Sequence, residues 1–147
     1  MDRVSKAVEN FKSGCNCSQS ILCAYADLFG MDQETAMRVS EGFGGGMGRM
    51  RLTCGAVSGM FMLAGLKFSR AKAADLETRT KVYGMVQKMA EEFKDMNGSI
   101  ICADLLGINL PKDKGAVPTK RDGEFYKKRP CIGCIEDCAK IVEKYLL

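Results

Sequence analysis

The chain has 147 residues, with 22 lysines and arginines against 18 aspartates and glutamates, eight cysteines and no histidine. At this length we expect one domain, and the net charge of +4 permits an anionic partner without requiring one. The lack of histidine excludes histidine-ligated zinc or haem and nucleophilic pairs in which histidine is the base. Chemistry in this chain must therefore use sulfur, carboxylates, backbone dipoles or a bound cofactor.

The sequence favours a cytoplasmic protein without a membrane partner. Residues 1–9 carry charges and contain no apolar core of a secretory signal. The longest apolar run, Cys54 to Leu66, is too short and too rich in glycine to span a bilayer. In a reducing compartment, clustered cysteines indicate metal or redox chemistry more often than a structural disulfide framework.

Apolar residues recur at helical spacing along most of the chain, and no stretch alternates cleanly with period two. This pattern predicts an all-α fold, with one domain over residues 1–147 built as an irregular orthogonal bundle of about six or seven helices. The expected helices cover residues 2–11, 15–29, 32–41, 53–68, 72–96, 100–106 and 131–145.

The helix expected at 72–96 is amphipathic, with charges on one side and an apolar stripe on the other. We expect this stripe to be buried. Its members are Leu76, Tyr83, Val86, Ala90 and Phe93.

Residues 108–130 show no convincing period and read as a long basic loop. A solvated loop explains the charge better than nucleic-acid binding, because no stacking aromatic motif or recognition helix accompanies it. We therefore expect no nucleic-acid partner. The basic residues include Lys112, Lys114, Lys120, Arg121, Lys127, Lys128 and Arg129.

Five glycines between Gly42 and Gly48 disfavour a helix, permit positive φ angles and allow something to approach the backbone closely. Gly55 and Gly59, spaced four residues apart in the following helix, suit close helix packing as well as they suit ligand approach. From this stretch we predict four cofactor-binding positions, namely Gly44, Gly45, Gly46 and Gly55.

Cys54 follows the glycines near the start of an apolar helix, with Thr53 as the expected N-cap. A thiol there lies beside unpaired N–H groups and the positive end of the helix dipole, which favour the thiolate. We expect Cys54 to be the most thiolate-like cysteine of the chain.

Four cysteines share this position at or within the first turn of an expected helix, so each should have a lowered pKa. If these helix starts meet, the sulfurs line one electropositive pocket that can hold a soft metal or an iron–sulfur cluster, or form disulfides reversibly. We predict a catalytic site of Cys17, Cys54, Cys102 and Cys131.

Cys131 and Cys134 form a CxxC motif, which suits metal ligation or a dithiol–disulfide pair. Cys134 and Cys138 lie one turn apart and could equally belong to the core. The predicted metal ligands are therefore Cys17, Cys54, Cys102, Cys131 and Cys134, whereas Cys15, Cys23 and Cys138 receive no assigned role.

Three functions stay open at this stage. The first is a redox protein that uses the four cysteines for electron transfer or thiol–disulfide exchange, as an oxidoreductase or an electron-transfer component. The second is a non-catalytic metal or iron–sulfur cluster binder, and the third is a helical interaction scaffold with buried cysteines. The residues do not distinguish a disulfide from zinc or an iron–sulfur cluster. They leave the redox partner open between a protein and a small molecule, and a homodimer is open as well.

The chain resembles the family of redox-active proteins named for a C_GCAxxG_C_C pattern. Cys54-Gly55-Ala56-Val57-Ser58-Gly59 matches its central motif, and Cys17, in Asn-Cys-Ser-Gln, matches its first cysteine. Cys102 matches the third cysteine and Cys131 the fourth, within a resemblance that spans about Val4 to Tyr145. The resemblance implies a redox role for the same four cysteines and assigns nothing to the other four.

Overall fold

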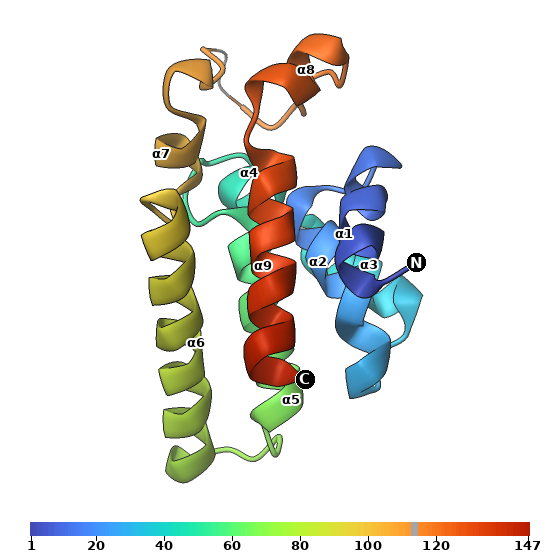
Figure 1. Ribbon diagram of the computed structural model, residues 1–147. Coiled ribbons are helices and arrows are strands. Elements are labelled where there is room, and N and C mark those ends of the chain that lie inside the picture. Colours follow the sequence, from blue (N-terminus) through green and yellow to red (C-terminus); the bar gives the residue numbers. More distant parts are fainter. Residues whose placement is uncertain (113–114) are drawn as a thin grey trace.

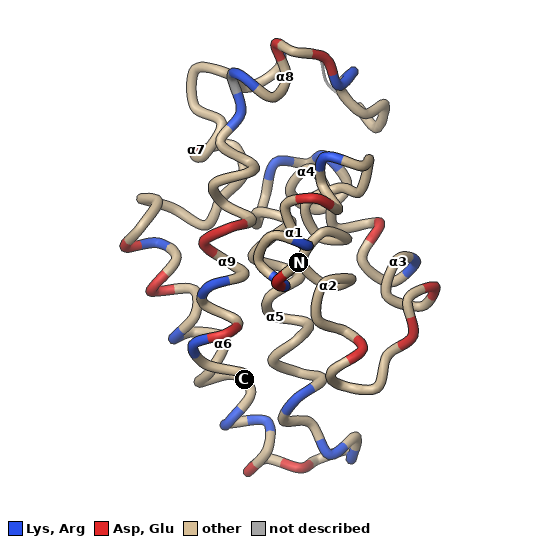
Figure 2. Tube along the Cα trace, turned by 45° about the vertical axis from the view of Figure 1, so that its right-hand side comes forward, with Lys and Arg blue, Asp and Glu red and all other residues tan. Residues whose placement is uncertain are grey.

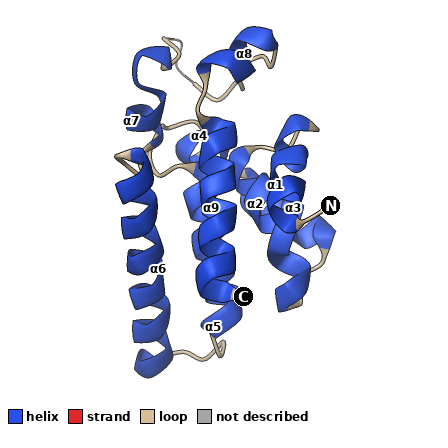
Figure 3. Ribbon diagram, viewed as in Figure 1, coloured by secondary structure: helices blue, strands red, loops and turns tan. Residues whose placement is uncertain are grey.

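The computed structural model describes residues 1–112 and 115–147, with every side chain among them except that of Lys128. The chain is 70% helical and the described residues form no strand, which confirms the all-α prediction (Figure 3). The elements are α1 (Arg3–Lys12), α2 (Cys17–Tyr25), η1 (Ala26–Phe29), α3 (Gln33–Glu41), α4 (Gly44–Met47), α5 (Gly55–Phe68), α6 (Leu76–Asn97), α7 (Cys102–Leu106), η2 (Gly107–Asn109), α8 (Gly123–Lys128) and α9 (Cys131–Leu146).

Every helix expected from the sequence has a counterpart, and the structure adds α4, α8 and the two 3₁₀ turns. The segment 108–130, expected to be a loop, contains α8; its residues 113 and 114 lie outside the described part. Asp122 caps α8 by accepting a hydrogen bond from the backbone N–H of Phe125 at 3.0 Å. The Phe125 and Tyr126 rings pack against Phe11, with centroids 6.1 and 6.0 Å away. A six-residue helix depends on such tertiary contacts, so periodicity alone gives no signal for it.

The core lies where α2, α5 and α9 pack together, with α1 beside α2 and α9, and α6 along the other side of α5 and α9 (Figure 1). The hydroxyl of Tyr25 in α2 donates to Glu143 Oε2 in α9 at 2.6 Å. Gly59 lets α2 approach α5, because an added Cβ there would lie 2.9 Å from the carbonyl oxygen of Ser18. The largest fully buried side chains are Tyr25, Phe11, Phe93, Ile21, Leu22, Met60, Leu63, Met89, Ile135, Ile141, Leu146 and Val57.

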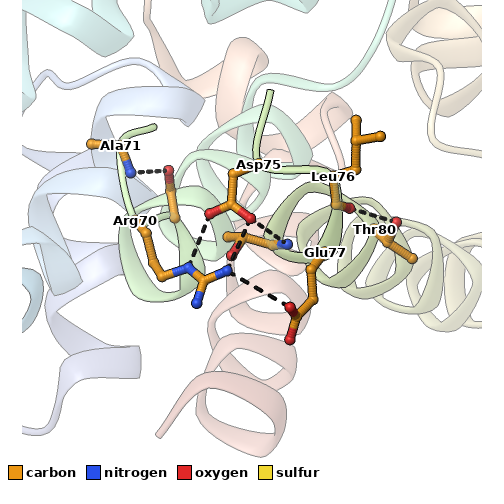
Figure 4. A network of polar contacts seen from close by, with 8 residues as sticks. Arg70, Ala71, Asp75, Leu76, Glu77 and Thr80 are labelled. Atoms are coloured by element: carbon orange, nitrogen blue, oxygen red, sulfur yellow. Dashed lines mark hydrogen bonds and ion pairs between the residues drawn. The ribbon is translucent and has the colours of Figure 1, made fainter. Parts of the chain in front are cut away.

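The prediction that the apolar stripe of α6 is buried is wrong for the N-terminal end of the helix. Leu76 and Tyr83 are 67% and 60% exposed, whereas Met89 and Phe93 are fully buried. The reason is that the core packs against only the second half of this long helix. Helical spacing predicts which face of a helix is apolar, but not how much of its length is buried. The start of α6 is held instead by polar contacts: Asp75 accepts from Thr78 N at 3.2 Å and pairs with Arg70 at 2.9 Å (Figure 4).

No helix in the described ranges combines the length and the apolar character needed to cross a bilayer.

Candidate functional site

The four predicted cysteines lie at helix starts, as expected. Cys17, Cys102 and Cys131 are the first residues of α2, α7 and α9, and Cys54 is the N-cap of α5. All four line one cavity of about 550 Å³, together with Cys134. We call it the thiol cavity. Its lining residues include members of α4, α7 and the beginning of α9, and these elements lie at one end of the bundle (Figure 1).

Cys17 is placed by a capping box. Asn16 Oδ1 accepts from the backbone N–H of Gln19 at 2.9 Å, and the backbone N–H of Asn16 donates to Gln19 Oε1 at 3.0 Å. Two otherwise unpaired donors at the start of α2 are thereby satisfied. Asn16 Nδ2 also donates to the carbonyl oxygen of Glu41 at 2.9 Å, which ties this helix start to the end of α3.

Cys54 and Cys102 are brought together by a short antiparallel pairing of the segments that precede α5 and α7. The backbone N–H of Cys54 donates to Ile100 O at 2.8 Å, and that of Cys102 donates to Leu52 O at 2.6 Å. Thr53, the expected N-cap, instead occupies the bridge between these two bonds, opposite residue 101. The cap of α5 therefore falls one residue later, on Cys54 itself.

Three of the predicted glycines allow the backbone to lie close to side chains from other segments of the chain. A Cβ on Gly46 would lie 2.6 Å from the Cβ of Cys102, and one on Gly55 would lie 3.1 Å from the Cβ of Cys17. A Cβ on Gly44 would lie 2.4 Å from Asn16 Nδ2. Close packing thus accounts for these positions without a ligand. All four predicted glycines line the thiol cavity, and their role in binding a cofactor stays a prediction: Gly44, Gly45, Gly46 and Gly55.

Residues 45–49 form an unusual turn in which five consecutive residues have positive φ angles. Glycine adopts positive φ angles without penalty, but Arg49 within this turn and Arg51 just after it also have positive φ angles, of 67° and 62°. A left-handed conformation costs a residue with a Cβ roughly 1–2 kcal/mol. Both arginine side chains line the thiol cavity, so the strained backbone coincides with charge directed to the site.

Cys17 and Cys131 share a hydrogen bond, and we call them the outer pair because both side chains are half-buried. The bond from Cys17, followed by the charges of nearby arginines, lowers the pKa of Cys131 to about 7. The same bond, followed by burial, raises the pKa of Cys17 well above its usual value, because the bond holds its proton. The expected lowering of the Cys17 pKa is therefore wrong.

Cys54 and Cys134 form a second such pair, and we call them the inner pair because both are buried. The hydrogen bond from Cys134, assisted by the backbone N–H groups of Val57 and Ala56, lowers the pKa of Cys54 against the effect of burial. The direction of this shift agrees with the lowered pKa expected for Cys54, and its rank as the most thiolate-like cysteine stays a prediction. As the donor, Cys134 has a strongly raised pKa.

The expected lowering of the Cys102 pKa is wrong as well. Burial raises the pKa of its thiol, and Arg51, whose Nη1 lies 3.7 Å from the sulfur, opposes that rise only in part. The position of a cysteine at a helix start therefore does not fix its proton affinity. A thiol that donates a hydrogen bond, or that loses much of its solvent, keeps its proton despite the helix dipole.

The cavity supplies soft thiolate donors of the kind that zinc and iron–sulfur clusters use. In the part of the chain that the structure describes, however, no three Cys, Asp or Glu side chains are grouped as a metal ion would require. The hydrogen bonds join the sulfurs in pairs. A metal role thus stays a prediction for Cys17, Cys54, Cys102, Cys131 and Cys134.

Three cysteines do not line the thiol cavity. Cys15 places its sulfur 3.9 Å from Met37 Sδ, Cys23 is 3% exposed, and Cys138 is fully buried in the core. Burial raises the pKa of each of these thiols.

Sequence reasoning missed two cavity residues, Arg121 and Arg129, by assigning them to a solvated loop. Both are half-buried and line the thiol cavity. Their guanidinium groups stack on the ring of Phe125, with centroid distances of 5.5 and 4.5 Å. The aromatic pair within this basic segment was the signal that could have indicated a folded segment.

No curated protein and no solved structure matches the chain. One family model matches residues 15–145, and its description reads "Putative redox-active protein (C_GCAxxG_C_C)". The match covers all five cysteines that line the thiol cavity and runs from the start of α2 almost to the end of α9. The chain therefore belongs to the C_GCAxxG_C_C family of redox-active proteins.

Proposed function

We propose that this protein carries out thiol–disulfide exchange and that the outer pair, Cys17 and Cys131, is its reacting dithiol. The observation that carries the proposal is that Cys17 and Cys131, at the starts of α2 and α9, line the same cavity. The interaction between the two thiols and the nearby arginines supports it, because it lowers the pKa of Cys131 to about 7. An attacking thiol is most effective when its pKa lies near the ambient pH, because it is then ionised and still strongly nucleophilic.

The reaction with a disulfide substrate balances with these two residues alone. The Cys131 thiolate attacks one substrate sulfur, forms a mixed disulfide and releases the other half of the substrate as a thiolate. Cys17 then loses its proton and attacks the sulfur of Cys131, which releases the second half. The substrate gains two electrons, and the protein ends with a Cys17–Cys131 disulfide.

The inner pair extends this proposal, because the CxxC motif joins Cys131 of one pair to Cys134 of the other. A disulfide formed at the outer pair passes inward when Cys134 attacks Cys131 and frees Cys17. Cys54 then attacks Cys134 and frees Cys131. One disulfide is conserved throughout, and it ends between Cys54 and Cys134, where burial shields it from solvent.

The experiment is oxidation of the fully reduced protein by one equivalent of a small disulfide, with each product identified by peptide mapping. We expect a Cys17–Cys131 disulfide first and a Cys54–Cys134 disulfide later. Cys131→Ser should abolish rapid oxidation, whereas Cys15→Ser, a half-buried cysteine outside the cavity, should oxidise at the wild-type rate. Wild-type oxidation rates in Cys131→Ser would overturn the proposal.

A second candidate function is non-catalytic binding of a metal or an iron–sulfur cluster. It is supported by the five cysteines that line one cavity, since thiolates are preferred ligands of these groups. The metal content of protein purified without oxygen separates the two candidates.

A further inference from the structure

The thiol cavity has a second chemical character, because four arginines line it beside the cysteines. Arg49 and Arg51 follow α4, each with a positive φ angle, and Arg121 and Arg129 come from the segment around α8. Figure 2 shows basic residues on the segments around α4 and α8 at this end of the bundle. Among the described residues that line the cavity, Glu41 is the only acidic one.

Three of these arginines contact neutral acceptors or a thiol. Arg51 Nη1 lies 3.7 Å from Cys102 Sγ, and Arg129 Nη2 donates to Thr119 Oγ1 at 3.0 Å. Arg121 donates to the backbone carbonyls of residues 11 and 15, at 2.6 and 2.7 Å. Within the described ranges, no carboxylate forms an ion pair with any of the three.

Half-buried cations without an acidic partner are costly, because each loses part of its hydration and repels the others. Arg51 adds backbone strain to this cost, since its φ angle is 62°. A guanidinium has five N–H donors, so Arg51 and Arg129 each retain donors beyond the contacts named above. The starts of α2, α5 and α9 add the positive ends of three helix dipoles to the same space.

The size of the cavity indicates what kind of anion it suits. A volume of about 550 Å³ lies within the range that small-molecule sites occupy. The planar guanidinium fork pairs with carboxylates and other oxyanions through two parallel hydrogen bonds. An anion bound there would lie beside Cys131, because the same cavity contains both.

We propose that Arg51 and Arg129 bind the oxyanion groups of a small disulfide and so present its sulfurs to Cys131. The substrate class is an anionic disulfide of low molecular weight. The reaction of the substrate disulfide with Cys131 rests on the proposed thiol–disulfide function. The binding of the anion by the two arginines does not. Two electrons pass from the outer pair to the substrate, which leaves as two anionic thiols, and the protein keeps a Cys17–Cys131 disulfide.

The test compares three small disulfides of different charge: dianionic dithiodipropionate, neutral bis(hydroxyethyl) disulfide and dicationic cystamine. The rate constant for oxidation of the reduced protein is measured for each. It is divided by the rate of the same disulfide with free mercaptoethanol, which corrects for the leaving groups. We expect normalised rates in the order anionic, neutral, cationic, with about tenfold or more between the extremes, as electrostatic steering produces.

Arg51→Gln and Arg129→Gln should each reduce this preference. Because both charges also help to lower the pKa of Cys131, the neutral disulfide should react more slowly as well, so the readout is the ratio of the anionic to the neutral rate. Arg38→Gln, which removes an exposed arginine at the end of α3, is the matched control and should keep the wild-type order. Should a variant fail to fold, the wild-type protein still decides the question. Raising the ionic strength from about 0.01 to about 1 M shortens the Debye length from about 30 to about 3 Å and should reduce the preference.

The outcomes separate the two proposals. Equal normalised rates for all three disulfides would overturn the anion assignment and leave the exchange function standing. Failure of every disulfide to oxidise the outer pair would overturn the exchange function. In that case, protection of the wild-type protein against thermal unfolding by inorganic phosphate or malonate, lost in Arg129→Gln, would still support an anion site. The absence of such protection would overturn the anion site as well.

Discussion

Arg51 Nη1 lies 3.7 Å from the sulfur of Cys102, and the backbone pairing of their two segments holds this arrangement in place. The charge counteracts the burial that raises the pKa of Cys102. In Arg51→Gln, we therefore expect the pKa of Cys102 to rise further and its alkylation at pH 8 to become slower. Mass spectrometry of iodoacetamide-labelled peptides measures this rate. An unchanged Cys102 rate in Arg51→Gln would contradict the assigned contact.

Cys131 should titrate near pH 7 in the wild-type protein, so its alkylation rate should rise through that pH. The hydrogen bond from Cys17 is the main cause, and Cys17→Ala removes it. The midpoint should then shift upward, toward the ordinary value of 9.0. Cys15→Ala is the control and should leave the midpoint in place. A midpoint near 7 in Cys17→Ala would assign the lowered pKa to the arginines instead.

Two glycines of α5 should respond in opposite ways to alanine. Gly59→Ala brings a methyl group 2.9 Å from Ser18 O and should destabilise the protein by about 1–3 kcal/mol through overpacking between α2 and α5. Gly65→Ala, in the same helix, meets open space and should stabilise by about 0.5–1 kcal/mol through helix propensity. Urea unfolding of both variants checks this, and equal effects would argue against close packing at Gly59.

The Tyr25 hydroxyl joins α2 to α9 and so helps to align the helix starts that carry the outer pair. Tyr25→Phe should lower the free energy of unfolding by about 0.5–1.5 kcal/mol, the usual net value of one hydrogen bond. Tyr83→Phe, which removes an exposed hydroxyl, should have little effect. Denaturant unfolding measures both. A loss in Tyr25→Phe no larger than in Tyr83→Phe would mean that the bond adds nothing.

Metal analysis distinguishes exchange from metal binding. For the exchange function, we expect protein purified without oxygen to contain no stoichiometric iron or zinc and to react at all eight cysteines after denaturation. Reversible oxidation should then proceed in the presence of a chelator. One equivalent of tightly bound metal, together with thiols that resist oxidation until it is removed, would favour the second candidate function instead.

The helices could be predicted from the sequence because apolar spacing and cap residues are local signals. Asn16, Asp32 and Asp75 each cap a helix through a side chain only a few residues from its partner. The short helix α8 and the exposed half of α6 could not be predicted, since packing across the molecule decides both. In α8, Phe125 packs against the ring of Phe11, which lies far away in the sequence. In α6, no neighbouring element of the described chain packs over Leu76, which is therefore exposed.

The sequence by itself determined the positions of four cysteines at helix starts and excluded chemistry based on histidine. It could not say which sulfurs meet, because Cys17 and Cys131 are separated by most of the chain. Tertiary packing decided the two pairs, made Cys17 a proton donor and Cys131 an acceptor, and placed Arg121 and Arg129 in the cavity. Proton affinity depends on the neighbours and solvent that surround a thiol after folding, and only the folded structure supplies these.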